Sequence, residues 1–169
     1  MKKIVLFAVL LMTFAIFKAT AQTFPVPENY SLKAKEDYSK YEADVIKTVD
    51  WLQNATSSED KDKLMAANRF LVAWISGSSD VTISISSALA DISDKNPSYL
   101  MIYMGGYAKY VLQHKDDKNT LNAKVAGLRQ VISKYISDTD HVKNSPVEKL
   151  ASLDKKGKLE NWAASNLKE

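Results

Sequence analysis

Residues 96–114 read NPSYLMIYMGGYAKYVLQH, and this stretch decides how the rest of the chain must fold. It is the longest apolar segment downstream of residue 21. Asn96 suits a helix N-cap, and Pro97 suits the first helical position, where a missing N–H costs nothing. Apolar and tyrosine side chains then cover most of the helix circumference, so neighbouring elements have to bury it on several sides. The stretch therefore predicts a central helix over 97–114.

Two adjacent glycines, Gly105 and Gly106, interrupt the predicted central helix. Each costs about 1 kcal/mol relative to Ala in a helix interior. Close approach of a neighbouring helix would offset that cost, and we expect both glycines to mark such a contact. A local kink and a gap that faces a ligand are the alternatives.

The amino terminus has the pattern of an export signal over residues 1–21. Lys2 and Lys3 precede an apolar run at 4–17, and Ala19-Thr20-Ala21 matches a cleavage motif. The run is too short for a comfortable transmembrane helix, which needs about 20 residues. The absence of Cys excludes a lipoprotein anchor. We expect cleavage after residue 21, no stable membrane anchor afterwards, and a periplasmic or extracellular protein.

The charge balance changes once the predicted signal is removed. The whole chain has 23 basic and 20 acidic residues, and three of the lysines lie in the signal. The remainder is therefore neutral overall, which argues against a nucleic-acid partner. The absence of Cys also excludes thiol nucleophiles and Cys-based zinc sites. We expect neither a metal nor a cofactor.

Residues 22–29 form the next segment, in which Pro25 and Pro27 predict an extended leader without regular structure. The remaining residues, 30–169, have the length of a single domain. Apolar residues recur there with helical spacing, and polar turns separate the periodic segments. Besides the central helix, we expect helices at 30–53, 59–77, 119–136, 145–157 and 159–167.

Local capping signals place several of these helix ends. Residues 54–58 supply an N-cap for the second helix, with Asp60 in its first turn. Residues 145–148, SPVE, combine a capping box with Pro at the first helical position. Gly157 suits the C-cap of the helix that follows.

Residues 78–93 carry two competing patterns. Val81, Ile83 and Ile85 alternate with hydroxyl side chains, as in a half-buried strand. Asp80 is a plausible helix cap, and an apolar stripe with helical spacing follows it, formed by Val81, Ile85, Ala88, Leu89 and Ile92. A lone strand would find no partner in an otherwise helical chain. We therefore favour a helix and leave the strand open.

The predicted elements amount to seven helices of modest length joined by short polar loops. This pattern is typical of an all-α domain built from helix hairpins. We expect stacked antiparallel hairpins around the central helix, arranged either as a compact bundle or as a short curved stack.

Four stretches stand out along the chain: Trp51-Leu52, FLVAWISG at 70–77, DVTI at 80–83, and Asn96-Pro97 followed by MGGY at 104–107. Together with the exported leader, they resemble a group of small exported helical proteins from Gram-negative bacteria of the Bacteroidota type. The resemblance spans residues 30–165. It implies export and a helical fold, and it implies no activity and no functional residue, because the matching positions are core and cap positions.

Residues able to carry out catalysis are few. His114 and His141 are the only histidines, and they lie too far apart in the sequence to face a metal from one helix. No Gly-x-Ser-x-Gly nucleophile motif is present. A pair of carboxylates could in principle hydrolyse a glycan. The candidates by chemistry are Asp37, Asp44, Asp50, Asp91 and Asp94.

The most specific feature is a row of tyrosines on the predicted central helix. Tyrosine supplies a flat apolar surface with a polar tip, which suits binding sites. The row, together with one of the two arginines, predicts a groove for a sugar, a peptide or a peptidoglycan fragment. The alternative is that the rings pack in the core and only their hydroxyls reach the surface. The groove residues are Tyr99, Tyr103, Tyr107, Tyr110 and Arg69.

The predicted export and the lack of a catalytic motif favour a binding or scaffold protein of the cell envelope. Its partner would be a protein or another envelope component. A small envelope hydrolase that acts on cell-wall or glycan material through a carboxylate pair is the alternative. A third possibility is an envelope protein whose partner is a second copy of itself.

Overall fold

The computed structural model describes residues 23–56 and 58–168. The predicted signal at 1–21 and the first residue of the leader lie outside the described residues. The described part is all-helical, as predicted, and contains eight helices. They are α1 (Lys35–Lys40), α2 (Glu42–Asn54), α3 (Lys61–Gly77), α4 (Ser87–Ser93), α5 (Ser98–Gln113), α6 (Thr120–Ser137), α7 (Ser145–Lys155) and α8 (Leu159–Asn166).

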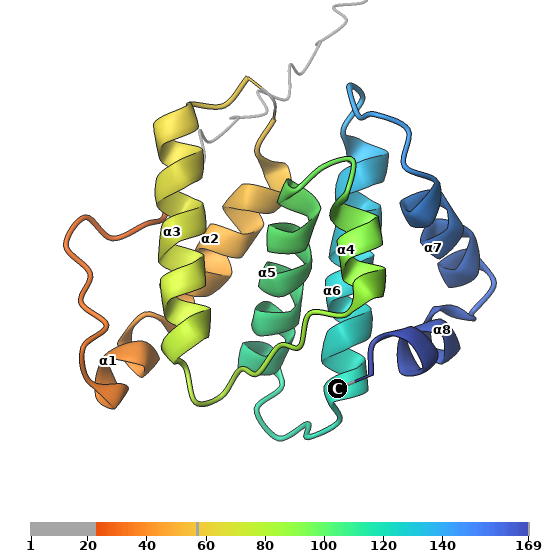
Figure 1. The fold of residues 1–169 in the computed structure, drawn as a ribbon. Coiled ribbons are helices and arrows are strands. Elements are labelled where there is room, and N and C mark those ends of the chain that lie inside the picture. The colour runs from red at the N-terminus through yellow and green to blue at the C-terminus, as the bar shows by residue number, and fades with distance from the viewer. Residues whose placement is uncertain (1–22, 57, 169) are drawn as a thin grey trace, which may run out of the picture.

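The helices pack in a row. In Figure 1, α3, α2, α5 and α6 follow one another across the molecule, and α7 and α8 cover the far side of α6. The most extensive helix pairing is between α5 and α6, while α4 lies against α5 and also touches α7. Neighbours in the row are mostly neighbours in the sequence, which is the arrangement expected of stacked hairpins.

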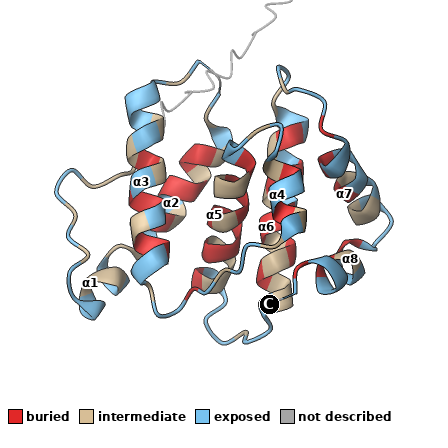
Figure 2. Ribbon diagram, in the orientation of Figure 1, coloured by how far each residue is buried: buried red, intermediate tan, exposed pale blue. Residues whose placement is uncertain are grey.

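The central helix α5 carries the core, as its sequence predicts. Eight of its residues are buried, and Figure 2 shows buried positions along its whole length. Its start is shifted by one residue from the prediction, because Pro97, with helical dihedral angles, is the N-cap and Ser98 is the first helical residue. Asn96 Oδ1 still accepts a hydrogen bond from the Ser98 N–H at 3.1 Å. Helices on both sides of α5 in the row therefore pack against it to form the core.

Close packing on both sides of α5 occurs at its two glycines. A Cβ atom on Gly105 would lie 3.1 Å from a methyl group of Val49 in α2. A Cβ atom on Gly106 would lie 3.0 Å from the Cα atom of Gly127 in α6. Each glycine thus faces a different neighbouring helix. Because both side chains are missing, α2 and α6 can each approach α5 closely.

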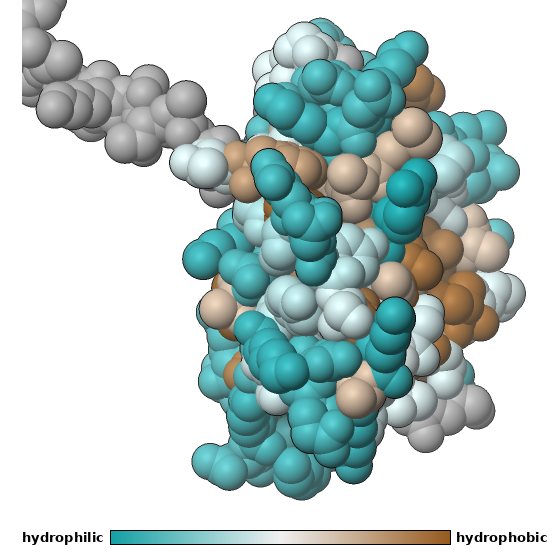
Figure 3. Space-filling model, turned by 90° about the vertical axis from the view of Figure 1, so that its left-hand side faces the viewer, coloured by the Kyte–Doolittle hydropathy of each residue, from teal (hydrophilic) through white to brown (hydrophobic). Residues whose placement is uncertain are grey.

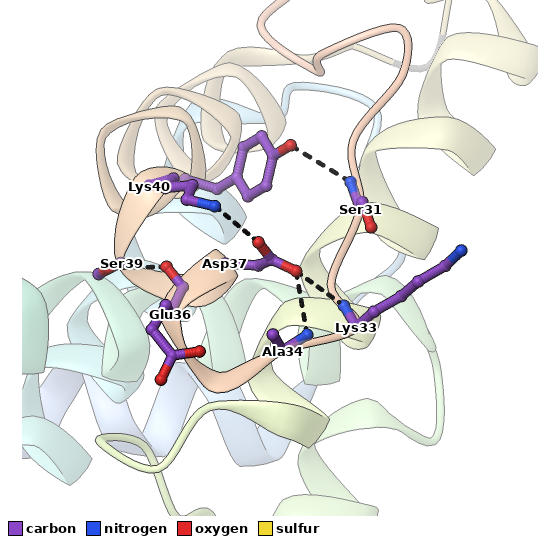
Figure 4. Close-up of polar contacts among 8 residues, drawn as sticks. Ser31, Lys33, Ala34, Glu36, Asp37, Ser39 and Lys40 are labelled. Atoms are coloured by element: carbon purple, nitrogen blue, oxygen red, sulfur yellow. Dashed lines mark hydrogen bonds and ion pairs between the residues drawn. The ribbon is translucent and has the colours of Figure 1, made fainter.

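The predicted first helix, 30–53, is wrong at its start and in its continuity. Residues 30–34 are not helical, because the Asp37 carboxylate accepts hydrogen bonds from the backbone N–H groups of Lys33 and Ala34 at 3.1 and 3.0 Å and caps α1 there (Figure 4). Tyr41 then breaks the helix between α1 and α2 with φ −103° and ψ 5°. Its hydroxyl accepts from the Ser31 N–H, which holds the break against the preceding loop.

The leader packs onto the domain. Residues 23–29 have no regular structure, as predicted. The ring of Phe24 meets Trp51 of α2 edge-on with centroids 5.2 Å apart, and Tyr30, the residue directly after the leader, meets Phe70 of α3 at 4.8 Å. Aromatic contacts of this kind contribute beyond their buried area. The leader therefore covers the outer end of the helix row.

Residues 78–86 form neither of the two predicted structures. The segment is extended without being part of a sheet, and α4 begins only at Ser87. Asp80 consequently caps no helix, and the predicted helical stripe is correct only from Ala88 onward. In Figure 1 the segment runs as a coil from the end of α3 to the start of α4. We call residues 78–86 the strap.

Two other predicted caps are shifted by a few residues. Asp60, expected in the first turn of the second helix, is instead its N-cap and accepts from the Asp62 and Lys63 N–H groups. Asn144, rather than Ser145, caps α7 by accepting from the Val147 N–H.

The C-cap expected at Gly157 is present. Gly157 has a φ of 65°, the left-handed conformation that favours glycine after a helix. The next N–H, that of Lys158, donates to the Leu153 carbonyl at 2.8 Å, which closes the end of α7.

Candidate functional site

The four tyrosines of α5 divide into two groups. Tyr99 and Tyr103 are each 1% exposed and belong to the core, where the Tyr99 ring packs edge-on against Tyr135. Burial raises the pKa of the Tyr103 phenol. Tyr107 and Tyr110, one and two turns further on, border a cavity, although Tyr107 is itself buried at 3% exposure. Of the four tyrosines predicted to form a groove, only Tyr110 is therefore partly exposed at this cavity.

The cavity lies between the strap, the end of α5, the loop that follows it and the start of α6. Its volume is about 540 Å³, within the usual range for small-molecule sites. We call it the strap cavity. It is lined by Ser79, Asp80, Thr82, Ser84, Tyr107, Tyr110, Val111, Leu112, Lys115, Asp117, Lys118, Asn119, Thr120 and Ala123.

Local structure presents the strap to this cavity. Val81 is buried, at 4% exposure, and Ile83 is half-buried, so these two side chains anchor the strap to the core. In an extended chain the alternate residues face the other way. Thr82 and Ser84 are accordingly exposed and border the cavity.

Hydroxyl groups with no internal partner gather at the strap cavity. Thr82 and Ser84 form no hydrogen bond with any residue that the structure describes, and neither does the side chain of Thr120 at the start of α6. Each hydroxyl offers one donor and two acceptor positions. The cavity wall therefore has unused hydrogen-bonding capacity next to the rings of Tyr107 and Tyr110.

Asp117 is the fixed charge of the site. Its carboxylate accepts from the Tyr110 hydroxyl at 2.7 Å, from the Asn122 amide at 2.8 Å and from the Asn119 N–H at 2.9 Å. The hydrogen bond from Asn122 is the largest of the effects that lower the pKa of Asp117 to about 2. The same pairing with Asp117 raises the pKa of the Tyr110 phenol. These bonds fix the Tyr110 ring at the cavity rim.

The two lysines of the cavity wall already have partners. Lys115 Nζ lies 2.6 Å from a carboxylate oxygen of Glu42, and this hydrogen bond raises the pKa of Lys115. Lys118 Nζ donates to the Lys115 carbonyl at 2.8 Å. With Asp117 also engaged, the described lining has no strong excess of either charge.

The carboxylates named from the sequence do not converge on the cavity. Four of them pair with lysines: Asp37 with Lys40, Asp44 with Lys47, Asp50 with Lys109, and Asp94 with Lys95. Asp91 is exposed on α4. The carboxylates that do line the cavity, Asp80 and Asp117, were not among the predicted candidates. The spacing Asp117-Lys118-Asn119 just before a helix was the available signal, because such residues commonly build turns.

The histidines lie in two separate places. His114 stacks on Tyr110 with ring centroids 4.1 Å apart, at the edge of the cavity. His141 packs on Tyr135 at 3.9 Å, at the other end of α6. Within residues 23–56 and 58–168, no group of three or more His, Cys, Asp or Glu side chains is placed to hold a metal.

A second, more open hollow of about 690 Å³ runs along α6 on the other side of Tyr110. Its lining includes Gln53, Arg129, Gln130 and Glu160. Arg69, the arginine proposed from the sequence, is exposed on α3 and lines neither hollow. Seen from the α3 side, the surface is mostly hydrophilic, with apolar atoms toward one edge (Figure 3).

Comparison with models of protein families, with curated proteins and with solved structures finds no match to the chain. The resemblance drawn from short stretches of sequence stays an expectation. Within the described part of the chain, no helix has both the length and the apolar character needed to cross a membrane.

Proposed function

We propose that this is an exported, non-catalytic binding protein of the cell envelope, and that the strap cavity is its ligand site. The observation that carries the proposal is the set of unpartnered hydroxyls, Thr82, Ser84 and Thr120, beside two tyrosine rings in a cavity of about 540 Å³. Pockets of this size with a few convergent polar groups are the usual form of a small-molecule site.

The lining favours a neutral ligand rich in hydroxyl groups, such as a saccharide fragment. Hydroxyl groups can both donate to and accept from a sugar, and the carboxylates of Asp80 and Asp117 add further acceptors. The half-buried Tyr110 ring, which stacks on His114, provides an apolar surface at the rim for the ring of a sugar. The cavity lysines are already paired with Glu42 and a backbone carbonyl, which disfavours an anionic ligand.

A hydrolase that uses Asp80 and Asp117 is the second candidate, because both carboxylates line the same cavity. Glycan hydrolysis needs one carboxyl group with a raised pKa to act as the general acid. The pKa of Asp117 is instead lowered to about 2 by three hydrogen bonds, so Asp117 is a permanent anion at neutral pH. In such a hydrolase Asp117 could therefore serve only as the ionised carboxylate of the pair, and Asp80 would have to be the acid.

The test is a titration of ¹⁵N-labelled protein, residues 22–169, with soluble muropeptides and with N,N′-diacetylchitobiose. We expect chemical-shift changes concentrated at the amides of Thr82, Ser84 and Thr120. The double variant Thr82→Val/Ser84→Ala should weaken binding at least tenfold, whereas Ser152→Ala on the exposed face of α7 should leave it unchanged. Shifts absent or spread over the surface would contradict the proposal, and release of monosaccharide would favour the hydrolase.

Export is tested separately by the mass of the protein recovered from the envelope or the medium. A chain that begins at Gln22 supports the proposed localisation. A chain that retains residues 1–21 contradicts it.

A further inference from the structure

The strap is an extended segment whose main chain has no partner. From Val81 to Ile85, the N–H and C=O groups form no hydrogen bond with any residue in the described part of the chain. Its side chains nevertheless alternate as in a strand, with Val81 buried, Ile83 half-buried, and Thr82 and Ser84 exposed. The segment therefore has the side-chain pattern of a strand, although it forms no regular structure and belongs to no sheet in the described part of the chain.

The strap also lacks the features that normally prevent strand pairing. Exposed strand edges are usually protected by charged residues, prolines or bulges. Residues 81–86 read VTISIS and contain no charge, no Pro and no Gly. The β-branched residues Val81, Thr82, Ile83 and Ile85 favour extended structure. Nothing in this sequence opposes the addition of a second strand.

We propose that the strap pairs with the strap of a second copy of this chain, forming an antiparallel two-stranded ribbon about a two-fold axis. The sequence is self-complementary in this register. With Ile83 on the axis, Thr82 lies opposite Ser84 of the second copy, and Val81 lies opposite its Ile85. Such a contact is isologous, which is the commonest form of a homodimer interface.

The change in burial along the strap favours a second copy of the chain as the partner that pairs with it. Val81 is 4% exposed, whereas Ile85 is 53% exposed. The apolar side chains of the strap are therefore buried at its amino-terminal end and exposed at its carboxyl-terminal end. Antiparallel pairing sets the exposed Ile85 of each copy beside the buried Val81 end of the other. Both copies thereby cover an apolar side chain that a single copy leaves in water. The main-chain groups gain partners at the same time.

This inference rests on main-chain groups and on Ile85, and it shares Thr82 and Ser84 with the proposed ligand site, so its readout is the oligomeric state and not ligand binding. It is tested with two double variants of the mature chain, Thr82→Lys/Ser84→Lys and Thr82→Glu/Ser84→Glu. In the proposed register, like charges face each other within either variant, whereas opposite charges face each other when the two are mixed. The control is Ser133→Lys/Ser152→Lys, at exposed serines of α6 and α7. Circular dichroism checks that each variant is folded.

Light scattering coupled to size exclusion, from micromolar to millimolar concentration, gives the readout together with hydrogen exchange of the strap amides. We expect the unmodified protein and the control to dimerise with concentration, each charged variant to stay monomeric, and an equimolar mixture to recover the dimer. The amides of residues 81–85 should be protected only in the dimeric samples. A monomer throughout, a dimer with unprotected strap amides, or a dimer that both charged variants retain would overturn the inference.

Discussion

Gly106 of α5 packs against Gly127 of α6, and neither position has room for a side chain. A Cβ atom on Gly106 would lie 3.0 Å from the Gly127 Cα atom, and one on Gly127 would lie 2.7 Å from the Tyr103 carbonyl oxygen. The most extensive helix pairing in the molecule is built on this contact. The two glycines therefore set the separation of the two central helices.

Enlarging these glycines should destabilise the fold. Gly127→Ala places a methyl group against a backbone oxygen that cannot move aside, and we expect a loss of about 1–3 kcal/mol in the free energy of unfolding. Gly106→Leu should cost several kcal/mol by the same overpacking. Urea unfolding followed by circular dichroism measures both, with Ala164→Leu at an exposed site of α8 as the control. Unchanged unfolding midpoints for both glycine variants would contradict the packing.

The buried Asn144 joins α4 to α7. Its side-chain amide donates to the Ile92 carbonyl at 2.8 Å, and its Oδ1 accepts from the Val147 N–H at 3.1 Å. Asn144→Ala removes the helix cap and leaves the carbonyl unpaired, so the expected cost is about 2–4 kcal/mol. Asn119→Ala removes only the exposed cap of α6 and should cost about 1 kcal/mol. Equal losses for the two variants in chemical unfolding would argue against a role for the buried bond.

Lys134 stabilises the end of α2 from the neighbouring helix α6. Its ammonium group donates to the Gln53 carbonyl at 3.2 Å and also to that of Ala55, where the helix dipole favours a cation. Burial lowers the pKa of Lys134. Lys134→Met should lose about 1–3 kcal/mol, because the carbonyls lose a charged donor. The control is Lys149→Met, at an exposed lysine of α7. Unfolding of both variants at the same urea concentration would contradict the prediction.

Stability should fall in acid partly through Asp117. Its pKa is about 2 in the folded protein and 3.8 ordinarily, so folding favours the ionised form. The contribution is complete above pH 3.8 and disappears as the pH falls through about 2. Asp117→Asn should therefore show a shallower loss of melting temperature between pH 4 and pH 2 than the unmodified protein. Asp116→Asn, at the exposed neighbouring residue, should keep the full slope, and identical slopes in all three proteins would count against this role.

Much of the fold follows from local sequence. The 3.6-residue periodicity of 96–114 and its Asn96-Pro97 start define α5. Asn119 marks the start of α6, and Gly157 marks the end of α7. Such signals act within one or two turns of the same helix. The break at Tyr41 was missed because a contact from outside the helix holds it, through the Ser31 N–H.

Only part of the candidate site could be predicted from the sequence. Four tyrosines spaced by four, four and three residues look equivalent along the chain. Tyr99, Tyr103 and Tyr107 are nevertheless buried, and only Tyr110 is partly exposed at the strap cavity. Asp80 and Asp117 are far apart in the sequence, and nothing local indicates that they share a cavity.

The sequence by itself determined the helical class, the central helix and the glycines at which it packs, because periodicity, capping and side-chain size are properties of neighbouring residues. The tertiary structure alone decided that residues 78–86 remain extended and that a hydroxyl-lined cavity lies beside them. The main chain of an extended segment forms hydrogen bonds only with residues distant in the sequence or with another molecule. Its structure therefore depends on which elements the rest of the fold places next to it.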